Sequence, residues 1–453
     1  MERRRTDILV AGAGAAGLLA ARAMVAQGLR VTVLEARPRS GWCFPWWVEV
    51  DSTALLEHVL PFPGPSVPCR LPEHGADFVS PSRRHAVHLE PSPLYGVALD
   101  PYLKQVGAEL QAQGVEFYFD SPLESFEPDG AAGIKATVVQ SGDSVEYKAR
   151  MLVLATGTMP QGHARSLQEM GFYLPEERPL EVIARHETWK LDEALAAQAT
   201  WPSTPGTSVN ILSVQAAFST LGITLSRDLG ECWLLSGISP EEGAPSPSEV
   251  LESTRSEFPA GLFLELTEQA QAPIPLSRPM PLLASRGVAL LGNLARQVSP
   301  LTASGLALAG RAARMLASVA VRYCRTQEPG LLFQYSSEYV TTLGATQAFA
   351  EGLTRTVLKH GKGGRLAEAM FEAGYIDAAE MIRVLGFRPL DLDIKDLPRR
   401  LWSLLKRPEL VSLIPGAGRA LAAYAATQGT YPHRPDAARI EAFDRRLSSI
   451  LAN

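Results

Sequence analysis

The stretch that decides the fold is DILVAGAGAAGLLAARAMVAQGLRVTVLEAR, residues 7–37. An apolar strand over 7–11 enters a glycine-rich turn, a helix of small and apolar residues follows from Ala15, and a second apolar strand covers 30–34. Glycines in such a turn allow a sharp bend, a close backbone approach to a pyrophosphate and close packing of helix on strand. The glycines concerned are Gly12, Gly14 and Gly17. The stretch predicts a βαβ unit that binds a dinucleotide.

An acidic residue, Glu35, stands at the end of the second strand and is followed by Ala36 and Arg37. A carboxylate at this point accepts hydrogen bonds from ribose hydroxyls and disfavours a ribose 2′-phosphate. The first motif therefore fits either NAD or FAD.

A second stretch far downstream, ALLGNLARQVSPLTASGLALAG at 289–310, chooses between these dinucleotides. It indicates a strand, a turn at Gly292 and Asn293, a proline, and a helix that begins near Ser304 and Gly305. A helix N-terminus of small residues presents free backbone N–H groups and a positive dipole end. A flavin with its ribityl chain extends well beyond the pyrophosphate and needs such a second cradle, so the two motifs together predict FAD. Asn293 is expected to bond ribityl or pyrophosphate oxygens.

A third element, ARMLVLATGTMP at 149–160, is an apolar strand ending in Ala-Thr-Gly, where two-dinucleotide-domain flavoproteins bring the chain back under the cofactor. The predicted cofactor-binding residues are Gly12, Gly14, Ala15, Ala16, Gly17, Glu35, Ala36, Arg37, Thr156, Gly157, Gly292, Asn293, Pro300, Ser304, Gly305 and Leu306.

Composition limits the classes of protein and of partner that the chain can have. The chain has 453 residues, 46% of them hydrophobic and 20% charged, with a net charge of −5, which is typical of a globular protein of two or three domains. This charge gives no reason to expect a nucleic-acid partner. The four cysteines form no CxxC pair, and no cluster of metal ligands stands out, so no metal is expected.

In these motifs the chain resembles the geranylgeranyl reductase-like branch of the FAD-dependent oxidoreductases, relatives of the aromatic hydroxylase and lycopene cyclase flavoproteins. The similar pieces are GAGAAG with Glu35, Cys43 soon after the second strand, YGVALDPYLKQVGAELQAQGVEFY at 95–118, and IPLSRPMPLLASRGVALLGNLARQVSPLTASGLALAG at 274–310. The resemblance implies an α/β fold: a Rossmann-type, glutathione-reductase-like FAD-binding domain, an antiparallel-sheet substrate domain and a helical C-terminal region.

We assign 1–60 with 96–165 and 286–325 to the discontinuous FAD-binding domain. Residues 61–95 with 166–285 form the sheet domain, because strand-like runs alternate there with connections rich in Pro, Ser and Gly. Residues 326–453 form the helical C-terminal region.

The sequence departs from the family in places that bear on the substrate. The family's Gly-Asp-Ala-Ala is Gly292-Asn293-Leu294-Ala295 here, and its Pro-Leu-Thr-Gly-x-Gly run is PLTASG at 300–305. A flavin-contacting arginine has no counterpart at Gly96 and Val97. The family's Cys-Gly-Gly becomes Cys43-Phe44-Pro45 and is followed by two tryptophans. FAD binding survives these changes, whereas the family's substrate does not follow.

Cys43 is the candidate catalytic residue, because the resemblance places it near the flavin ring, although a plain packing role is equally open. The aromatic residues around it suit a wall for an apolar or planar substrate, and core packing would use the same residues. The candidate substrate-binding residues are Trp42, Trp46, Trp47 and, on the sheet, Trp233.

Three functions fit the sequence. The first is reduction of C=C bonds, or a related dehydrogenation, of a lipophilic and isoprenoid-like molecule of secondary metabolism, with NAD(P)H or a redox protein as external electron donor. The second is an FAD-dependent monooxygenase of a hydrophobic or aromatic metabolite, which is weakened because Arg296 replaces the expected His. The third is a non-redox flavoprotein like the lycopene cyclases, on the texture of Trp46 to Asp51.

The tail contains a basic amphipathic segment, DLPRRLWSLLKRPELVSLIPGAGR at 396–419. Its composition suits a helix lying on an anionic membrane surface, and equally a helix that caps the domain with a solvated basic face. The expected location is the cytoplasm, with peripheral membrane contact through 396–419 as an alternative.

Overall fold

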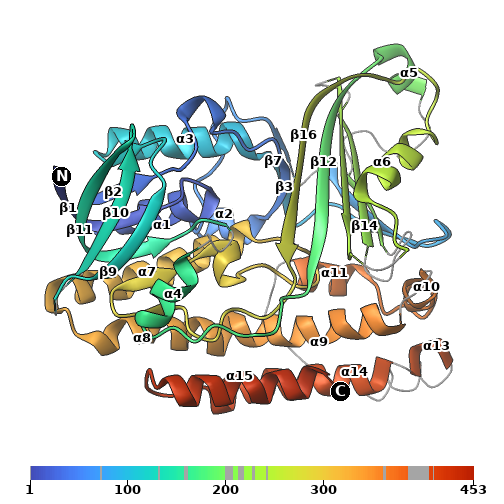
Figure 1. Cartoon of the computed structure of the whole chain (residues 1–453). Helices are drawn as coiled ribbons and strands as arrows, with labels where there is room; N and C mark the ends of the chain where they lie inside the picture. The colour runs from blue at the N-terminus through green and yellow to red at the C-terminus, as the bar shows by residue number, and fades with distance from the viewer. Residues whose placement is uncertain are drawn as a thin grey trace.

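The structure is a computed structural model that describes residues 2–71, 74–130, 133–157, 162–198, 208–212, 219–226, 230–240, 243–360, 364–385, 408–411 and 413–452. Two large sheets stand beside each other, and a layer of long helices runs below them (Figure 1).

The first sheet has eight strands in the order β17-β18-β11-β1-β2-β8, and β10 and β9 extend it from β11. The strands are β1 Glu2–Ala11, β2 Val31–Leu34, β8 Glu116–Tyr118, β9 Leu123–Pro128, β10 Ile134–Gln140, β11 Asp143–Leu154, β17 Ala284–Ser285 and β18 Val288–Leu290. β18, β11, β1, β2 and β8 run parallel. The centre of β1 is buried on both faces, which is why it reads as a continuous apolar run.

β1 begins earlier than the apolar pattern predicts. Its partner β11 reaches back to Asp143, so the ladder continues down to Glu2, which pairs with Val145. The guanidinium of Arg4 lies 4.4 Å from the ring centroid of Tyr118, so the aromatic ring covers this polar part of the strand.

Three helices pack on this sheet: α1 Ala15–Val25, α3 Leu99–Ala112 and α7 Leu306–Thr326. α1 contacts both α3 and α7. Its start depends on Gly17, because a Cβ there would lie 1.8 Å from the carbonyl oxygen of Gly12. The helix can therefore leave the strand only at this sharp angle if glycine occupies position 17.

The second sheet has the order β16-β12-β15-β14-β13-β5-β6. Its strands are β5 Ala76–Val79, β6 Ala86–Leu89, β12 Glu181–Leu191, β13 Ser208–Leu212, β14 Ser219–Ser226, β15 Glu231–Ile238 and β16 Phe263–Pro275. All neighbours are antiparallel except β13 and β5. One face of this sheet packs on α6 Pro247–Arg255 through its own apolar core.

A small sheet of β3 Trp47–Asp51, β7 Leu94–Ala98 and β4 Cys69–Arg70 lies between the two large ones (Figure 1). It contacts both sides: Trp47 stacks on Trp233 of β15, and Asp51 pairs with Arg311 of α7 at 3.0 Å. Shorter elements complete this half: η1 Arg39–Gly41, α2 Ser52–Leu56, α4 His163–Glu169, α5 Glu193–Gln198 and η3 Gly292–Ala295.

The described residues after 326 are helical. The elements are α8 Pro329–Tyr339, a π-helical turn at Val340–Gly344, α9 Ala345–His360, α10 Arg365–Glu372, α11 Ala378–Leu385, α13 Pro408–Val411, α14 Leu413–Thr430 and α15 Ala437–Ala452. Each described helix is too short or too polar to cross a bilayer. Most of the basic segment at 396–419 lies outside the described residues; within it, 408–411 belong to α13 and 413–419 to α14.

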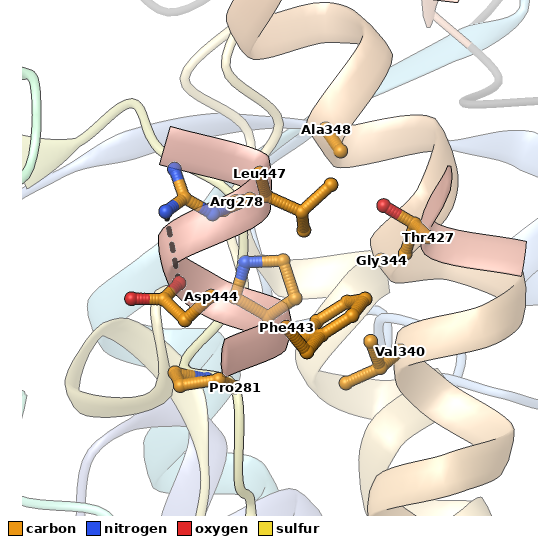
Figure 2. Close-up of a pocket in the computed structure, with 10 residues that line it drawn as sticks. Arg278, Pro281, Val340, Gly344, Ala348, Thr427, Phe443, Asp444 and Leu447 are labelled. Atoms are coloured by element: carbon orange, nitrogen blue, oxygen red, sulfur yellow. Dashed lines mark hydrogen bonds and ion pairs between the residues drawn. The ribbon is translucent and has the colours of Figure 1, made fainter. Parts of the chain in front are cut away.

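A buried ion network ties these helices to the connection between β16 and β17. The backbone N–H of Arg278 donates to Glu351 at 2.8 Å, and its guanidinium donates to Asp444 at 2.8 Å beside a small apolar pocket (Figure 2). Arg355 donates to the same Glu351 carboxylate, which is fully buried. One carboxylate therefore holds two arginines inside the protein.

Replacing Glu351 by Ala leaves both arginines without this partner, so we expect the free energy of unfolding to fall by about 3 kcal/mol. Glu265→Ala is the control, because Glu265 pairs with Lys190 at the surface and its loss should cost less than about 1 kcal/mol. Urea denaturation of both variants gives the comparison, and equal losses would contradict a structural role for the buried network.

Candidate functional site

The first turn of α1 is an open anion cradle. Gly14 is the N-cap, no side chain caps the helix, and no acidic residue lies in its first turn, so the leading N–H groups have no side-chain acceptor. A Cβ on Gly14 would find its nearest neighbour, an edge carbon of Phe44, at 4.0 Å. By contrast, a Cβ on Gly12 would lie 2.4 Å from the carbonyl oxygen of Ala155. Position 12 thus requires glycine because the backbone of Ala155 lies so close, whereas the space beside Gly14 is open to a ligand.

Thr156 and Gly157 follow directly on β11 beside this turn. A Cβ on Gly12 would lie 3.3 Å from Cα of Thr156, and Gly157 has open space around it. Both residues therefore lie next to the glycine loop, and their role under the cofactor stays a prediction.

Glu35 at the end of β2 is buried and already engaged. One carboxylate oxygen accepts from the N–H of Ala13 at 3.0 Å, and the other accepts from the backbone and the guanidinium of Arg37, both at 3.0 Å. A carboxylate has about four acceptor positions, so one remains for a hydroxyl group. Glu35 therefore fixes the glycine loop and Arg37 and keeps capacity for one ribose hydroxyl.

The second motif touches the first. Gly292, with φ of +72°, lies so close to α1 that a Cβ there would be 2.6 Å from the Cβ of Ala16. Asn293 is exposed, and its side-chain oxygen lies 3.8 Å from where a Cβ on Gly305 would be. Gly305 is the N-cap of α7, again without a capping side chain, and Leu306 is the first helical residue. Two uncapped helix N-termini are thus linked by direct contacts.

Gln297 holds this second loop from below. It is fully buried, accepts from the N–H of Gly292 at 2.9 Å and donates to the hydroxyl of Tyr335 at 2.8 Å. Tyr335, on α8, in turn donates to the carbonyl of Leu290 at 3.2 Å. The turn at Gly292 is therefore fixed by a helix of the C-terminal region.

Gln347 of α9 holds the same loop further on. Its side-chain amide donates to the carbonyls of Arg296 and Val298, both at 2.8 Å, and its oxygen accepts from Tyr339 at 2.9 Å. Tyr339 and Gln347 flank the π-helical turn, a feature that often marks functional positions. The sequence analysis missed Gln347 and Tyr335, because they occur in segments whose pattern is that of ordinary helices.

Trp42 is buried behind the glycine loop. Its indole N–H donates to the carbonyl of Ala13 at 2.9 Å, and the ring packs against Phe119 and against Gly107 of α3. The side chain is buried, so its contribution is to support the glycine loop from behind. The indole fills the space between the loop and α3, and the substrate role of Trp42 stays a prediction.

Cys43 and Phe44 lie in front of the glycine loop. Phe44 is the nearest side chain to Gly14, and its N–H donates to Asp100 at the start of α3 at 3.0 Å. Cys43 is exposed. Partial desolvation of the thiol, together with the charge of Asp100, raises the pKa of Cys43 above its usual range. The thiol is therefore protonated at neutral pH and suited to donate a proton.

Trp46 and Trp47 carry the same segment to the second sheet. Trp47 stacks on Trp233 with ring centroids 3.6 Å apart, and Trp46 lies 5.8 Å from the ring of His186 on β12. Trp46 and Trp47 are partly exposed, and Trp233 is buried. The five residues from Cys43 to Trp47 thus lead from the glycine loop to the face of the second sheet.

The structure places an arginine beside Gly96, although the sequence has none at positions 96 and 97. A Cβ on Gly96 would lie 3.1 Å from Nε of Arg70, the neighbouring residue on β4. Arg70 is buried, donates to the carbonyl of Gly75 at 2.6 Å and pairs with Glu49 at 3.0 Å. Its donors are used within the protein, so its role here is structural.

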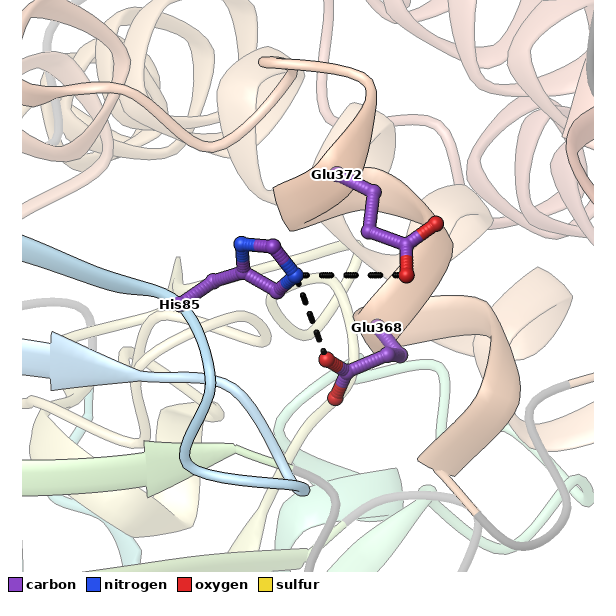
Figure 3. Close-up of side chains that lie close together, drawn as sticks. All are labelled: His85, Glu368 and Glu372. Atoms are coloured by element: carbon purple, nitrogen blue, oxygen red, sulfur yellow. Dashed lines mark ion pairs between the residues drawn. The ribbon is translucent and has the colours of Figure 1, made fainter.

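A cluster of metal-ligand type lies elsewhere. His85 faces Glu368 and Glu372 of α10 at 3.7 Å and 3.9 Å (Figure 3). The carboxylate of Glu368 also accepts from the hydroxyl groups of Ser80 and Ser82. The cluster is therefore the contact through which α10 packs on the turn between β5 and β6.

The Cys43 pKa gives a direct test. We expect alkylation of Cys43 by iodoacetamide, followed by mass spectrometry, to reach half its maximal rate at a higher pH than a free thiol. Asp100→Asn removes the repelling charge but keeps an acceptor for the N–H of Phe44, so the midpoint should move down. Cys43→Ser identifies the labelled site. A midpoint that stays in place or rises in Asp100→Asn would contradict this account of the thiol.

Comparisons with known proteins agree with this geometry. Residues 10–58 match a family model described as an NAD(P)-binding Rossmann-like domain. The digeranylgeranylglycerophospholipid reductase of Picrophilus torridus is 28% identical over 163 residues, which cover 33% of this chain and 39% of that protein. The chain therefore matches about two fifths of that relative's length.

Two solved structures extend the comparison to the whole fold. A geranylgeranyl bacteriochlorophyll reductase-like protein of Thermoplasma acidophilum has a TM-score of 0.64 at 16% identity, covering 90% of this chain and 98% of that one. The flavin-dependent halogenase CmlS has a TM-score of 0.59 at 16% identity, covering 99% of this chain and 78% of that one. At such identities the likeness concerns the fold and leaves the reaction open. The predicted α/β architecture and the predicted resemblance are confirmed: the chain has the fold of the FAD-dependent oxidoreductases and is similar to their geranylgeranyl reductase-like branch.

Proposed function

We propose that this protein is an FAD-dependent oxidoreductase that acts on a lipophilic, isoprenoid-like small molecule. The observation that carries the proposal is the contact of Gly292 with Ala16, because it joins two uncapped helix N-termini into one extended cradle. An NAD site would need only the first of these. The second suits the ribityl chain and the flavin ring of FAD.

The residues fit the parts of this cofactor. The first turn of α1, from Gly14 to Gly17, would hold the pyrophosphate, and Glu35 would accept from the adenosine ribose. Asn293 would bond ribityl or pyrophosphate oxygens as a neutral donor and acceptor, without adding negative charge beside the phosphates. The N-terminus of α7 at Gly305 would face the pyrimidine edge of the ring, where its dipole stabilises negative charge.

FAD supplies hydride transfer to or from carbon when it is bound. The chain's own residues then have to shape the substrate site and deliver a proton. Trp46, Trp47 and Trp233 offer an apolar surface that excludes water, and burial of such aromatic area favours a lipophilic substrate. The protonated thiol of Cys43 can donate the proton that accompanies hydride addition to a C=C bond.

The reaction test uses the complete protein with FAD. The flavin is reduced by dithionite without oxygen and mixed with a geranylgeranyl lipid, the substrate type named for the Picrophilus relative. We expect reoxidation of the flavin and a gain of two hydrogen atoms per reduced double bond, measured by mass spectrometry. Reoxidation that requires oxygen and adds an oxygen atom to the substrate would instead indicate a monooxygenase. Conversion without net consumption of reductant would indicate a non-redox flavoprotein like the lycopene cyclases.

The cofactor assignment is tested by Gly14→Val. Because a side chain at Gly14 meets open space in the protein itself, the variant should fold with a thermal midpoint within a few degrees of the parent. The added methyl groups fill the pyrophosphate's approach, so FAD affinity measured by fluorescence titration should fall at least about 100-fold. Gly330→Val is the matched control, since Gly330 also lies in the first turn of a helix with open space around it. Full FAD occupancy in Gly14→Val would refute this placement.

A further inference from the structure

One face of the second sheet carries several buried polar groups without partners. On this face, among the residues that the structure describes, four side chains have polar atoms that are inaccessible and make no hydrogen bond of ordinary geometry. They are both ring nitrogens of His186, the hydroxyl of Thr188, the amide nitrogen of Asn210 and the indole nitrogen of Trp233. We refer to these four residues as the polar row.

The strand register places the polar row on a single face. Thr188 lies directly opposite Trp233, and His186 lies opposite Leu235. Leu235 pairs with Gly222, which pairs in turn with Asn210. Directly paired residues point to the same side of a sheet, so all four members of the row share one face.

This face is the one turned toward the predicted flavin site. The alternate residues of β15, such as Cys232 and Leu234, belong to the apolar core that packs against α6. Trp233 instead meets Trp47, and His186 meets Trp46, both from the segment that leaves the glycine loop. The polar row therefore lies beside the aromatic surface to which we assign the substrate.

Such an arrangement is costly for packing alone. A buried donor or acceptor without a partner loses its bonds to water and gains none in return. His186 is 1% exposed, and the backbone of Pro45 interacts with its ring. Apolar side chains would fill the same sheet positions without this penalty. The groups on this face that have no ordinary hydrogen bond, Thr188 and Asn210 first among them, therefore indicate that a ligand completes their bonding.

The charges around the row disfavour an anionic ligand. Burial lowers the pKa of His186 to about 4, so the imidazole is neutral at physiological pH. Glu268 lies opposite Thr188, and Glu231 lies close by on the same face. Burial, together with the charge of a neighbouring carboxylate, raises the pKa of both. A face with acids and a neutral histidine does not favour an anion.

The hydrogen-bonding capacity of the row consists mainly of donors. Asn210 offers N–H groups and Thr188 offers a hydroxyl, whereas the backbone of Pro45 interacts with the His186 ring and the Glu231 carboxylate interacts with the Trp233 indole. Donors select oxygen acceptors. We propose that the polar row binds an uncharged carbonyl oxygen, of the ketone, aldehyde or quinone type, at one end of the lipophilic substrate. This inference rests on the proposed function and narrows its substrate class.

The test compares two probes that differ only in the oxygen: the isoprenoid ketone phytone and norpristane, the hydrocarbon with the same carbon skeleton. Binding to the FAD-loaded full chain is measured in one detergent by the flavin difference spectrum and by quenching of tryptophan fluorescence. We expect phytone to bind about ten-fold more tightly than norpristane.

Variants locate the origin of this preference. His186→Leu and Asn210→Leu should reduce the ratio of the two dissociation constants toward one, while norpristane still binds. Ser236→Ala is the matched control, because Ser236 also has a buried hydroxyl without a partner but pairs with Arg185 and lies on the opposite face. Its ratio should stay that of the parent.

The outcomes separate three claims: the polar row, the lipophilic substrate class and the proposed function. A parent protein that binds FAD and norpristane but shows no preference for phytone overturns the polar row and leaves the proposed function intact. Failure to bind FAD overturns the proposed function itself. Binding of FAD without either probe overturns the lipophilic substrate class and the polar row with it. If a Leu variant fails to fold, Asn210→Ala and His186→Gln provide the same comparison.

Discussion

The close approach of Gly292 to Ala16 is the constraint on which the rest of the structure depends. Two segments more than 270 residues apart in sequence meet with so little space that a single methyl group at position 292 would overlap the Cβ of Ala16. Because glycine occupies position 292, the strand-turn-helix unit that begins at β18 can lie directly against the first turn of α1. Everything proposed for the cofactor follows from this contact, since it brings two sets of free backbone N–H groups to one place.

The C-terminal helices maintain this contact. Gln297 and Tyr335 fix the turn at Gly292, and Gln347 fixes the next carbonyls, in each case through buried hydrogen bonds. Buried polar networks of this kind are demanding, because every member must be satisfied, but once satisfied they hold a single geometry. The helical region after residue 326 is thus part of the site's construction, although it supplies none of the predicted cofactor ligands.

The segment that lies around the glycine loop also reaches the second sheet. Trp42 stays behind the loop, Cys43 and Phe44 lie in front of it, and Trp46 and Trp47 meet the second sheet. A short, nearly continuous run of aromatic residues therefore connects the glycine loop to the second sheet. The neutral, donor-rich polar row on β12, β13 and β15 adds a polar end to an otherwise apolar surface.

Local spacing explains which parts could be predicted. The βαβ unit and the helix near Gly305 were predictable, because glycine positions and apolar runs encode them directly. The early start of β1 at Glu2 was not, since it depends on how far its partner β11 extends. The packing of Trp42 between the loop and α3 was not predictable either, because such burial leaves no trace in a linear pattern. Gln347 and His186 were missed for the same reason: only the register of strands and the packing of helices bring them to the site.

The most direct measurement of the central claim is the identity and amount of cofactor released when the purified protein is denatured. The joined cradle predicts a yellow protein that releases FAD, one molecule per chain when it is saturated. Release of FMN, or a protein that binds no flavin even when titrated with FAD, would contradict the claim that the two helix N-termini form one FAD site.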